Sequence, residues 1–198
     1  MAERDPKIPA DLECPGMESA EIHSMAMEFL TAPWHELLFG KDTAKYELQH
    51  TEDSLLFLAY GCAVDEFQHI MYQNPDLTPD QRNEKWLELE HKYRPWIDFD
   101  GLPFYGRGAG WQRQLHIYEC PFYYIDYCLS TMAALQFFLL NNQDHADAWQ
   151  RYLRLVRRAG CASYTELCQT AGLRVPFEEG SVQAIAQQVS QWIQQNQV

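Results

Sequence analysis

The sequence predicts an all-α protein that forms a single compact domain of several helices. Nearly every patterned stretch repeats apolar residues at three- and four-residue steps, as amphipathic helices do, and no strand-like alternation continues for more than a few residues. With 198 residues, of which 46% are hydrophobic, the chain is long enough to bury a substantial core. We expect a loosely ordered lead-in over residues 1–16 and one helical domain over residues 17–198.

Prolines end the first two expected helices, which cover residues 17–31 and 43–72. Pro33 follows the first and Pro75 the second, and a proline ends a helix because it lacks the backbone donor and clashes with the preceding turn. Further along, residues 101–110 are rich in glycine and aromatic side chains. We expect this segment to be a loop and the most mobile part of the domain.

Two later helices begin with capping boxes. Thr78 is followed three residues later by Gln81, and Ser163 by Glu166, so that each side chain can bond to the backbone amide of the other residue. Gly172 suits the end of the helix that Ser163 opens. A last amphipathic helix is expected over residues 181–195.

Charge and composition argue against several classes of protein. The formal net charge of −13 argues against nucleic-acid binding, which needs clustered cations. Residues 120–140 form a long apolar stretch, but Asp126 would cost about 2.5–3.5 kcal/mol inside a membrane, so we expect a buried helix. The six cysteines lack C-x-x-C spacing, and residues 1–12 lack an apolar leader core. We therefore expect a cytoplasmic protein with free thiols.

Two segments carry more specific information. The first, at residues 17–30, reads MESAEIHSMAMEFL, and the second, at residues 116–127, reads HIYECPFYYIDY. Both resemble the oligoendopeptidase F and thimet oligopeptidase family of zinc metallopeptidases, as does VDEFQH at residues 64–69. The resemblance covers about residues 17–193. It implies the C-terminal half of a zincin-like catalytic domain, which hydrolyses peptide bonds with a zinc-bound water.

The resemblance implies that the first segment holds part of a zinc site. Glu21 matches the family's third zinc ligand, and Glu28 matches a carboxylate that supports this ligand or orients a histidine. Seven residues at about 100° each leave the two within about 20° of one helix face. The alternative is a solvated face, but apolar neighbours such as Ile22 and Met25 leave little room for one, which favours the site.

The second segment, by the same resemblance, lines the substrate side of the zinc. His116, Tyr124 and Tyr127 match residues that bind the peptide and stabilise the oxyanion, and Tyr123 is an adjacent candidate. A phenol near a developing oxyanion stabilises charge that grows only in the transition state. The alternative is an aromatic helix packed in a core, a role that we expect for Phe122 and Phe137.

The chain departs from the family in one respect, because it contains no H-E-x-x-H sequence. The closest stretch begins with His35-Glu36 but has Phe39 where the second histidine must stand. A catalytic zinc needs three protein ligands. We therefore expect that this chain alone binds no zinc tightly and hydrolyses no peptide, although the complete family enzyme uses zinc. Its expected partners are short peptides and either a second copy of the chain or a complementing chain that carries H-E-x-x-H.

Two other functions remain open. One is a non-catalytic remnant that binds peptides or other proteins and forms oligomers. The other is a helical di-metal carboxylate protein, since Glu-x-x-His occurs at residues 47–50, 66–69 and 88–91. Three occurrences in an acidic helical chain show how easily this spacing arises, and the last lies in a polar run that we expect at the surface.

Overall fold

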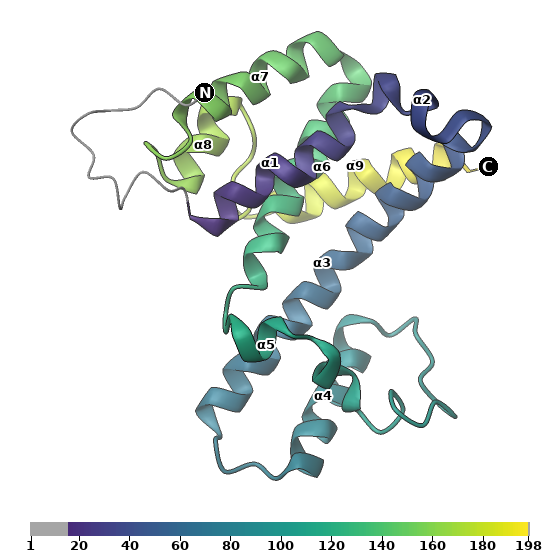
Figure 1. Cartoon of the computed structure of the whole chain (residues 1–198), viewed down its shortest axis with the longest axis vertical. Helices are drawn as coiled ribbons and strands as arrows, with labels where there is room; N and C mark the ends of the chain where they lie inside the picture. Colours follow the sequence, from purple (N-terminus) through teal and green to yellow (C-terminus); the bar gives the residue numbers. More distant parts are fainter. Residues whose placement is uncertain (1–15, 198) are drawn as a thin grey trace. The chain divides into compact units, whose positions relative to one another are not determined.

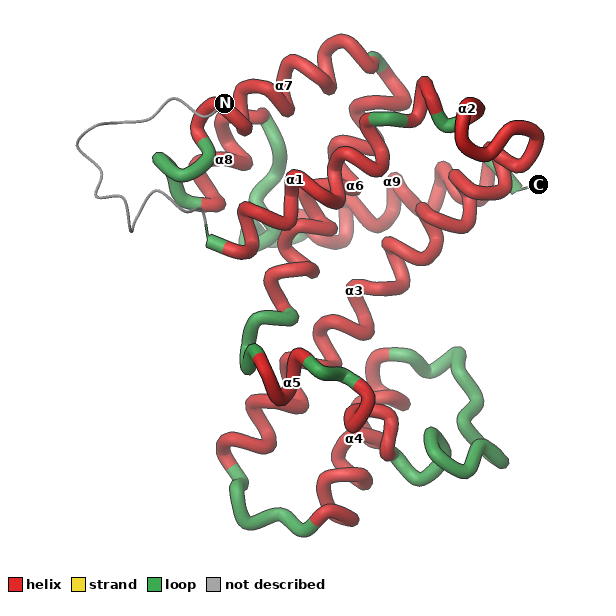
Figure 2. The backbone as a smooth tube through the Cα atoms, viewed as in Figure 1, coloured by secondary structure: helices red, strands yellow, loops and turns green. Residues whose placement is uncertain are grey.

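The structure is a computed structural model that describes residues 16–197, so most of the predicted lead-in lies outside the described residues. Within them every regular element is a helix and no strand is present (Figures 1 and 2). The prediction of an all-α protein is therefore confirmed. Among the same residues, no helix is long and apolar enough to cross a membrane.

Most helices follow one another through short turns, but a longer loop, residues 94–108, joins α4 to η4. The α-helices are α1 (Met17–Leu30), α2 (Glu36–Phe39), α3 (Thr43–Gln73), α4 (Pro79–Tyr93), α5 (His116–Glu119), α6 (Ile125–Gln143), α7 (His145–Arg158), α8 (Tyr164–Ala171) and α9 (Ser181–Gln195). The short 3₁₀ helices are η2 (Ala32–Trp34), η3 (Gly40–Asp42) and η4 (Ala109–Arg113).

The predicted capping boxes begin two of these helices. At the start of α4 the Thr78 hydroxyl accepts from the Gln81 amide, and the Gln81 side chain accepts from the Thr78 amide. Ser163 and Glu166 form the same pair before α8, which ends at Gly172 in the left-handed conformation. These signals are local in sequence, which is why they locate the helix ends without any knowledge of the fold.

Contacts between Cα atoms divide the chain into two compact units. Unit 1 comprises Met1–Leu55 with Leu129–Val198, and unit 2 comprises Leu56–Cys128. The helices α3 and α6 each contribute residues to both units. A single domain over residues 17–198 stays a prediction.

Unit 1 is built around the buried face of α1. Ile22, Ala26 and Phe29 recur at three- and four-residue steps on this face and are almost fully buried. The ring of Phe29 lies 5.1 Å from that of Phe138 on α6, which in turn lies 4.8 Å from Trp192 on α9. Helices α7 and α8 pack on each other and both contact α1. The face of α1 opposite this core is therefore left for polar residues.

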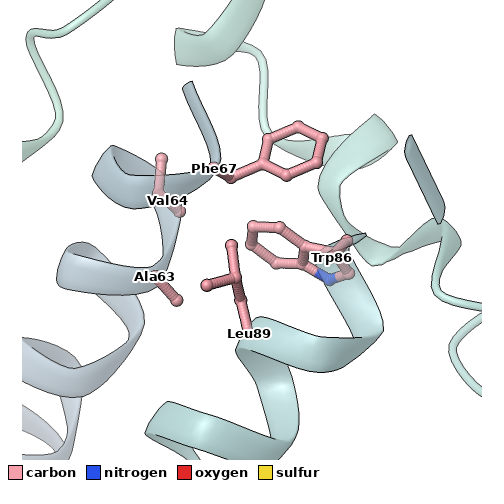
Figure 3. Packing of buried hydrophobic residues seen from close by; sticks show 5 residues of the cluster. All are labelled: Ala63, Val64, Phe67, Trp86 and Leu89. Carbon is pink, nitrogen blue, oxygen red and sulfur yellow. The ribbon is translucent and has the colours of Figure 1, made fainter. Parts of the chain in front are cut away.

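Unit 2 has its own hydrophobic core between α3 and α4. Ala63, Val64 and Phe67 of α3 face Trp86 and Leu89 of α4, and all five are buried (Figure 3). The Phe67 and Trp86 rings meet edge to face with centroids 5.3 Å apart, a favourable geometry for aromatic pairs. This core supports the partly buried side chains of η4, α5 and the segment before α6.

The apolar stretch at residues 120–140 differs from the single helix that we predicted. Helix α6 begins only at Ile125, and Pro121 lies in the break that separates it from α5. Phe122 has a φ of 63°, which is unfavourable for a residue with a side chain. Its amide donates to Oε1 of the buried Gln68 at 2.8 Å, a contact that holds this conformation. Phe122 is 36% exposed, so its predicted core role is wrong, whereas Phe137 of α6 is fully buried as predicted.

Candidate functional site

The two predicted carboxylates lie on α1, on the side away from the core of unit 1. Glu21 is half-buried, and its Oε2 accepts a hydrogen bond of 3.0 Å from the Ser24 hydroxyl. Glu28 is 53% exposed. The shared face follows from the seven-residue spacing, but the argument that apolar neighbours exclude a solvated face is wrong. Ile22 and Ala26 point into the core, and Ser24 and Glu28 are exposed.

Glu28 lies beside a histidine of its own unit. Its Oε2 is 3.1 Å from Nε2 of His50 on α3, and the His50 ring packs on Phe29 with centroids 4.6 Å apart. Burial lowers the pKa of His50, while the carboxylate of Glu28 opposes this effect. Glu28 thus lies at ion-pair distance from an imidazole, although Nε2 of His50 makes no hydrogen bond within the described residues.

His35, which begins the incomplete metal motif, is buried and held by contacts with other side chains and the backbone. It is 4% exposed, and its Nδ1 lies 3.0 Å from Oε1 of Glu47. Its Nε2 lies 3.0 Å from the backbone oxygen of Glu28. Both ring nitrogens therefore have partners within unit 1. The ring of Phe39 packs edge to face on the His35 ring, with centroids 5.9 Å apart.

The four residues predicted in the second segment form one ring cluster in unit 2. The ring of His116 lies 5.9 Å from Tyr123, 4.9 Å from Tyr124 and 5.8 Å from Tyr127. All four side chains are half-buried. The break at residues 120–124 brings the short α5 back against the start of α6, so that residues distant along the segment become neighbours.

A chain of hydrogen bonds fixes the orientation of His116. The Tyr60 hydroxyl donates to Oε1 of Gln114 at 2.9 Å, and Nε2 of Gln114 donates to Nδ1 of His116 at 2.6 Å. A ring that accepts at Nδ1 carries its proton on Nε2 when it is neutral. Burial raises the pKa of Tyr124, with smaller contributions from Tyr60 and Cys128. The Tyr124 hydroxyl therefore remains a hydrogen-bond donor at neutral pH.

Solved structures similar to this chain agree with the sequence resemblance. The chain is 47% identical to a protein described as an oligoendopeptidase F, over 91% of this chain and 32% of that one, with a TM-score of 0.88. Against PZ peptidase A, solved with an inhibitor, the identity is 46% over 94% of this chain and 33% of that one, with a TM-score of 0.90. The resemblance to the oligoendopeptidase F family is confirmed.

A third structure of the oligoendopeptidase F family agrees with the first two. It comes from Bacillus anthracis str. Ames, is 37% identical over 94% of this chain and 30% of that one, and has a TM-score of 0.78. The chain thus spans about a third of the length of the solved structures that it matches. No protein-family model and no curated protein matches the chain.

The residues of this oligoendopeptidase F-like chain do not by themselves fit a catalytic zinc. Among residues 16–197, no group of three or more His, Cys, Asp or Glu side chains is arranged to hold a metal ion. Glu21 offers one carboxylate, whereas a catalytic site needs three protein ligands and an open position. The two histidines that the resemblance implies as further zinc ligands have no counterpart beside Glu21 among the described residues.

Of the Glu-x-x-His pairs of the di-metal alternative, the one at residues 66–69 is engaged in other contacts. Glu66 binds Lys92 at 2.6 Å and accepts from the Tyr93 hydroxyl at 2.5 Å. His69 lies 3.4 Å from Asp65. These pairs stabilise helix surfaces, and nothing in the described residues brings them together as one metal site.

Sequence reasoning missed a cavity of about 500 Å³ that adjoins the ring cluster within unit 2. Tyr124 of the cluster lines it, together with Gln114, which bonds to His116. The pair formed by Glu90 of α4 and Arg94, the residue that follows α4, also lines it. That spacing was the available sequence signal, but it equally fits a surface ion pair.

Proposed function

We propose that this chain is the part of a zinc metallo-oligopeptidase that supplies one metal-binding carboxylate and a peptide-binding ring cluster. The 46–47% identity over more than nine-tenths of the chain to oligoendopeptidase F and PZ peptidase structures carries this proposal. Glu21 contributes a zinc ligand, and Glu28 supports the site through its contact with an imidazole. His116, Tyr124 and Tyr127 bind the peptide, with Tyr123 beside them.

The chemistry of the ring cluster suits this role. When bound, zinc supplies a polarised water and a Lewis acid in such enzymes. The residues of this chain bind the peptide and exclude water, and the Tyr124 hydroxyl serves as a hydrogen-bond donor. Because burial keeps that hydroxyl protonated, it can donate to an oxyanion as negative charge develops.

We further propose that the chain does not hydrolyse peptides alone. The test is a zinc titration and a fluorogenic peptide assay on the chain alone, and on the chain mixed with a protein that carries an H-E-x-x-H helix. We expect turnover only in the mixture, and Glu21→Gln should abolish it. The matched control is Glu36→Gln, which changes an exposed carboxylate on α2. Stoichiometric zinc binding and turnover by the chain alone would overturn the proposal.

The ring cluster can be tested in the same mixture. Tyr124→Phe removes the hydroxyl and keeps the ring, and we expect turnover to fall by about 10²–10³-fold, as for the loss of an oxyanion donor. Tyr118→Phe is the control, because Tyr118 is 53% exposed and stacks on Trp111 outside the cluster. Equal activity of the two variants would remove Tyr124 from the catalytic role.

Exposed apolar side chains favour a second candidate function, a peptide-binding remnant that forms oligomers. Leu37 and Leu38 on α2 are 82% and 77% exposed, and the nearby Trp34 is 52% exposed. Such a group is commonly covered by a partner. Light scattering should then show a dimer or larger species that the Leu37→Ser/Leu38→Ser variant converts to a monomer. A monomeric parent chain would rule out the homo-oligomer.

The thiols support a cytoplasmic location. Within residues 16–197, the cysteines at positions 62, 120, 128, 161 and 168 form no disulfide bond. Free thiols persist in reducing compartments.

A further inference from the structure

The lining of the cavity in unit 2 is positively charged, whereas the chain as a whole is negatively charged. Three charged residues line it, namely Glu90, Arg94 and Arg113. Glu90 is 2% exposed, and Arg94 binds it at two points, with Nε 2.7 Å from Oε2 and Nη2 2.6 Å from Oε1. This pair is neutral as a whole and rigid, since a bidentate contact fixes both side chains.

Arg113 gives the cavity a positive charge that no carboxylate of the described residues pairs with. Its guanidinium contacts the Tyr105 hydroxyl and packs over the Tyr105 ring. Within residues 16–197 no carboxylate lies within ion-pair distance of it. In a chain with a net charge of −13, this wall is locally cationic and suits a singly charged anion.

A buried donor in the same wall also lacks an acceptor. Trp86 is 1% exposed, and its Nε1 has no hydrogen-bond partner among the described residues. A buried N–H without a partner is unfavourable, and such donors are normally satisfied by protein, water or ligand. Gly110 lies next to this atom. A Cβ added to Gly110 would be 2.9 Å from Nε1 of Trp86 and 3.7 Å from Oε1 of Glu90. The glycine thus keeps the space beside the indole N–H open.

The remaining lining sets the size and chemistry of the ligand. Aromatic rings of Tyr60, Phe99, Tyr105 and Tyr124 surround the charged groups. A volume of about 500 Å³ is in the range of cavities that hold small organic groups. Aromatic rings and the charge of Arg113 favour a carboxylate with an apolar stem over a phosphate, whose second charge would need another cation.

We propose that this cavity binds the carboxylate of a short peptide, either its C-terminal carboxylate or an acidic side chain. Tyr60, Gln114 and Tyr124 join the cavity to the ring cluster, so a peptide bound at the cluster can place this group in the cavity. The inference deepens the proposed function and rests on it for the identity of the ligand as a peptide. The carboxylate selectivity rests on the cavity alone.

The test measures binding to the unmodified chain by calorimetry and needs no zinc or turnover. Three N-acetylated peptides that end in phenylalanine are compared: one with a free C-terminus, its C-terminal amide, and an amide that also contains one glutamate. We expect the free acid or the glutamate peptide to bind at least about tenfold more tightly than the neutral amide, as for a charged hydrogen bond. Whichever of the two binds more tightly identifies the source of the carboxylate.

Two arginine variants separate the cavity from general charge effects. Arg113→Met should remove the tenfold preference and leave amide binding unchanged. Arg107→Met is the matched control, because Arg107 is exposed, packs over Phe104 and does not line the cavity. Equal binding of acid and amide, or equal loss in both variants, would overturn the inference. Neither outcome affects the turnover test with Glu21→Gln, so the two proposals fail separately.

A third variant tests the space beside Trp86. Gly110→Ala places a methyl group in front of the indole N–H, and we expect it to weaken carboxylate binding while near-ultraviolet circular dichroism stays native. If Gly110→Ala unfolds the chain, the comparison of Arg113→Met with Arg107→Met alone tests the carboxylate site. A folded variant with unchanged carboxylate binding would contradict the role of the Trp86 donor.

Discussion

The acidic face of α1 and the ring cluster of unit 2 hold their side chains in different ways. Glu21 and Glu28 share a face because they are seven residues apart. Close polar partners of both, Ser24 and His50, come from helices of unit 1. The ring cluster depends on packing, since Tyr124 also contacts Phe57 and Tyr60 of α3. Helix register alone thus places the proposed metal ligand, whereas the proposed peptide-binding surface depends on the core beneath it.

The largest expected effect comes from removing that core. Trp86→Ala should lower the free energy of unfolding by about 3–5 kcal/mol, because it leaves a cavity between α3 and α4. Urea unfolding followed by circular dichroism measures the change. Glu21→Ala should cost less than about 0.5 kcal/mol, as expected for a polar side chain outside the core. A similar cost for both would contradict the comparison between the two regions.

A smaller effect is expected from the Glu90–Arg94 pair. Arg94→Ala leaves the Glu90 carboxylate buried without its partner and should cost about 2 kcal/mol, less than for a fully buried pair because Arg94 is 21% exposed. The control is Lys85→Ala, which breaks the exposed pair with Glu88 and should cost less than about 1 kcal/mol. Adding Glu90→Gln to Arg94→Ala should restore part of the stability.

Thiol reactivity tests the packing of unit 2 at the junction of α3 and α6. A hydrogen bond with Cys128 lowers the pKa of Cys62 to about 7, against the opposing effect of burial. Iodoacetamide should therefore modify Cys62 near neutral pH, and Cys128→Ala should slow this reaction by raising the pKa. Mass spectrometry of peptides after timed labelling measures it. A rate that does not change in Cys128→Ala would show that another group activates the thiol.

The smallest effect is expected at the α1 carboxylates. Burial holds the pKa of His50 below its ordinary value of 6.5, so the unfolded chain binds this proton more readily. The neutral form therefore stabilises the fold fully above pH 6.5, and this stability is lost as the pH falls towards the lower folded pKa. Glu28→Gln should lower the pKa of His50 further. An NMR titration of the imidazole measures the shift, and a rise would contradict the contact with Glu28.

Local signals in the sequence predicted much of the fold. The boxes at Thr78 and Ser163 located two helix starts because both partners lie within one turn. The segment at residues 116–127 predicted residues that do lie together as rings. The break before Ile125 was missed because it depends on a hydrogen bond from Phe122 to Gln68, which is 54 residues away.

The cavity could not be predicted for the same reason. Its charged groups come from the end of α4 and from η4, and the loop between them determines whether Arg113 lies near the Glu90–Arg94 pair. The glycines of that loop were interpreted as a source of mobility. Instead, Gly108 lies so close to the Asn83 carbonyl of α4 that a Cβ would collide with it, and Gly110 packs against Trp86. Close packing and flexibility favour the same residue, and only tertiary contacts distinguish them.

This packing of Gly108 and Gly110 determines where the chain can accept extra residues. Gly101, at the other end of the same loop, has no atom within 4 Å of the position that its Cβ would occupy. A reporter peptide inserted after Gly101 would therefore extend into open space, whereas one inserted at Gly108 would push the loop off α4. The same ten-residue segment thus contains a permissive site for fluorescent labelling and a forbidden one.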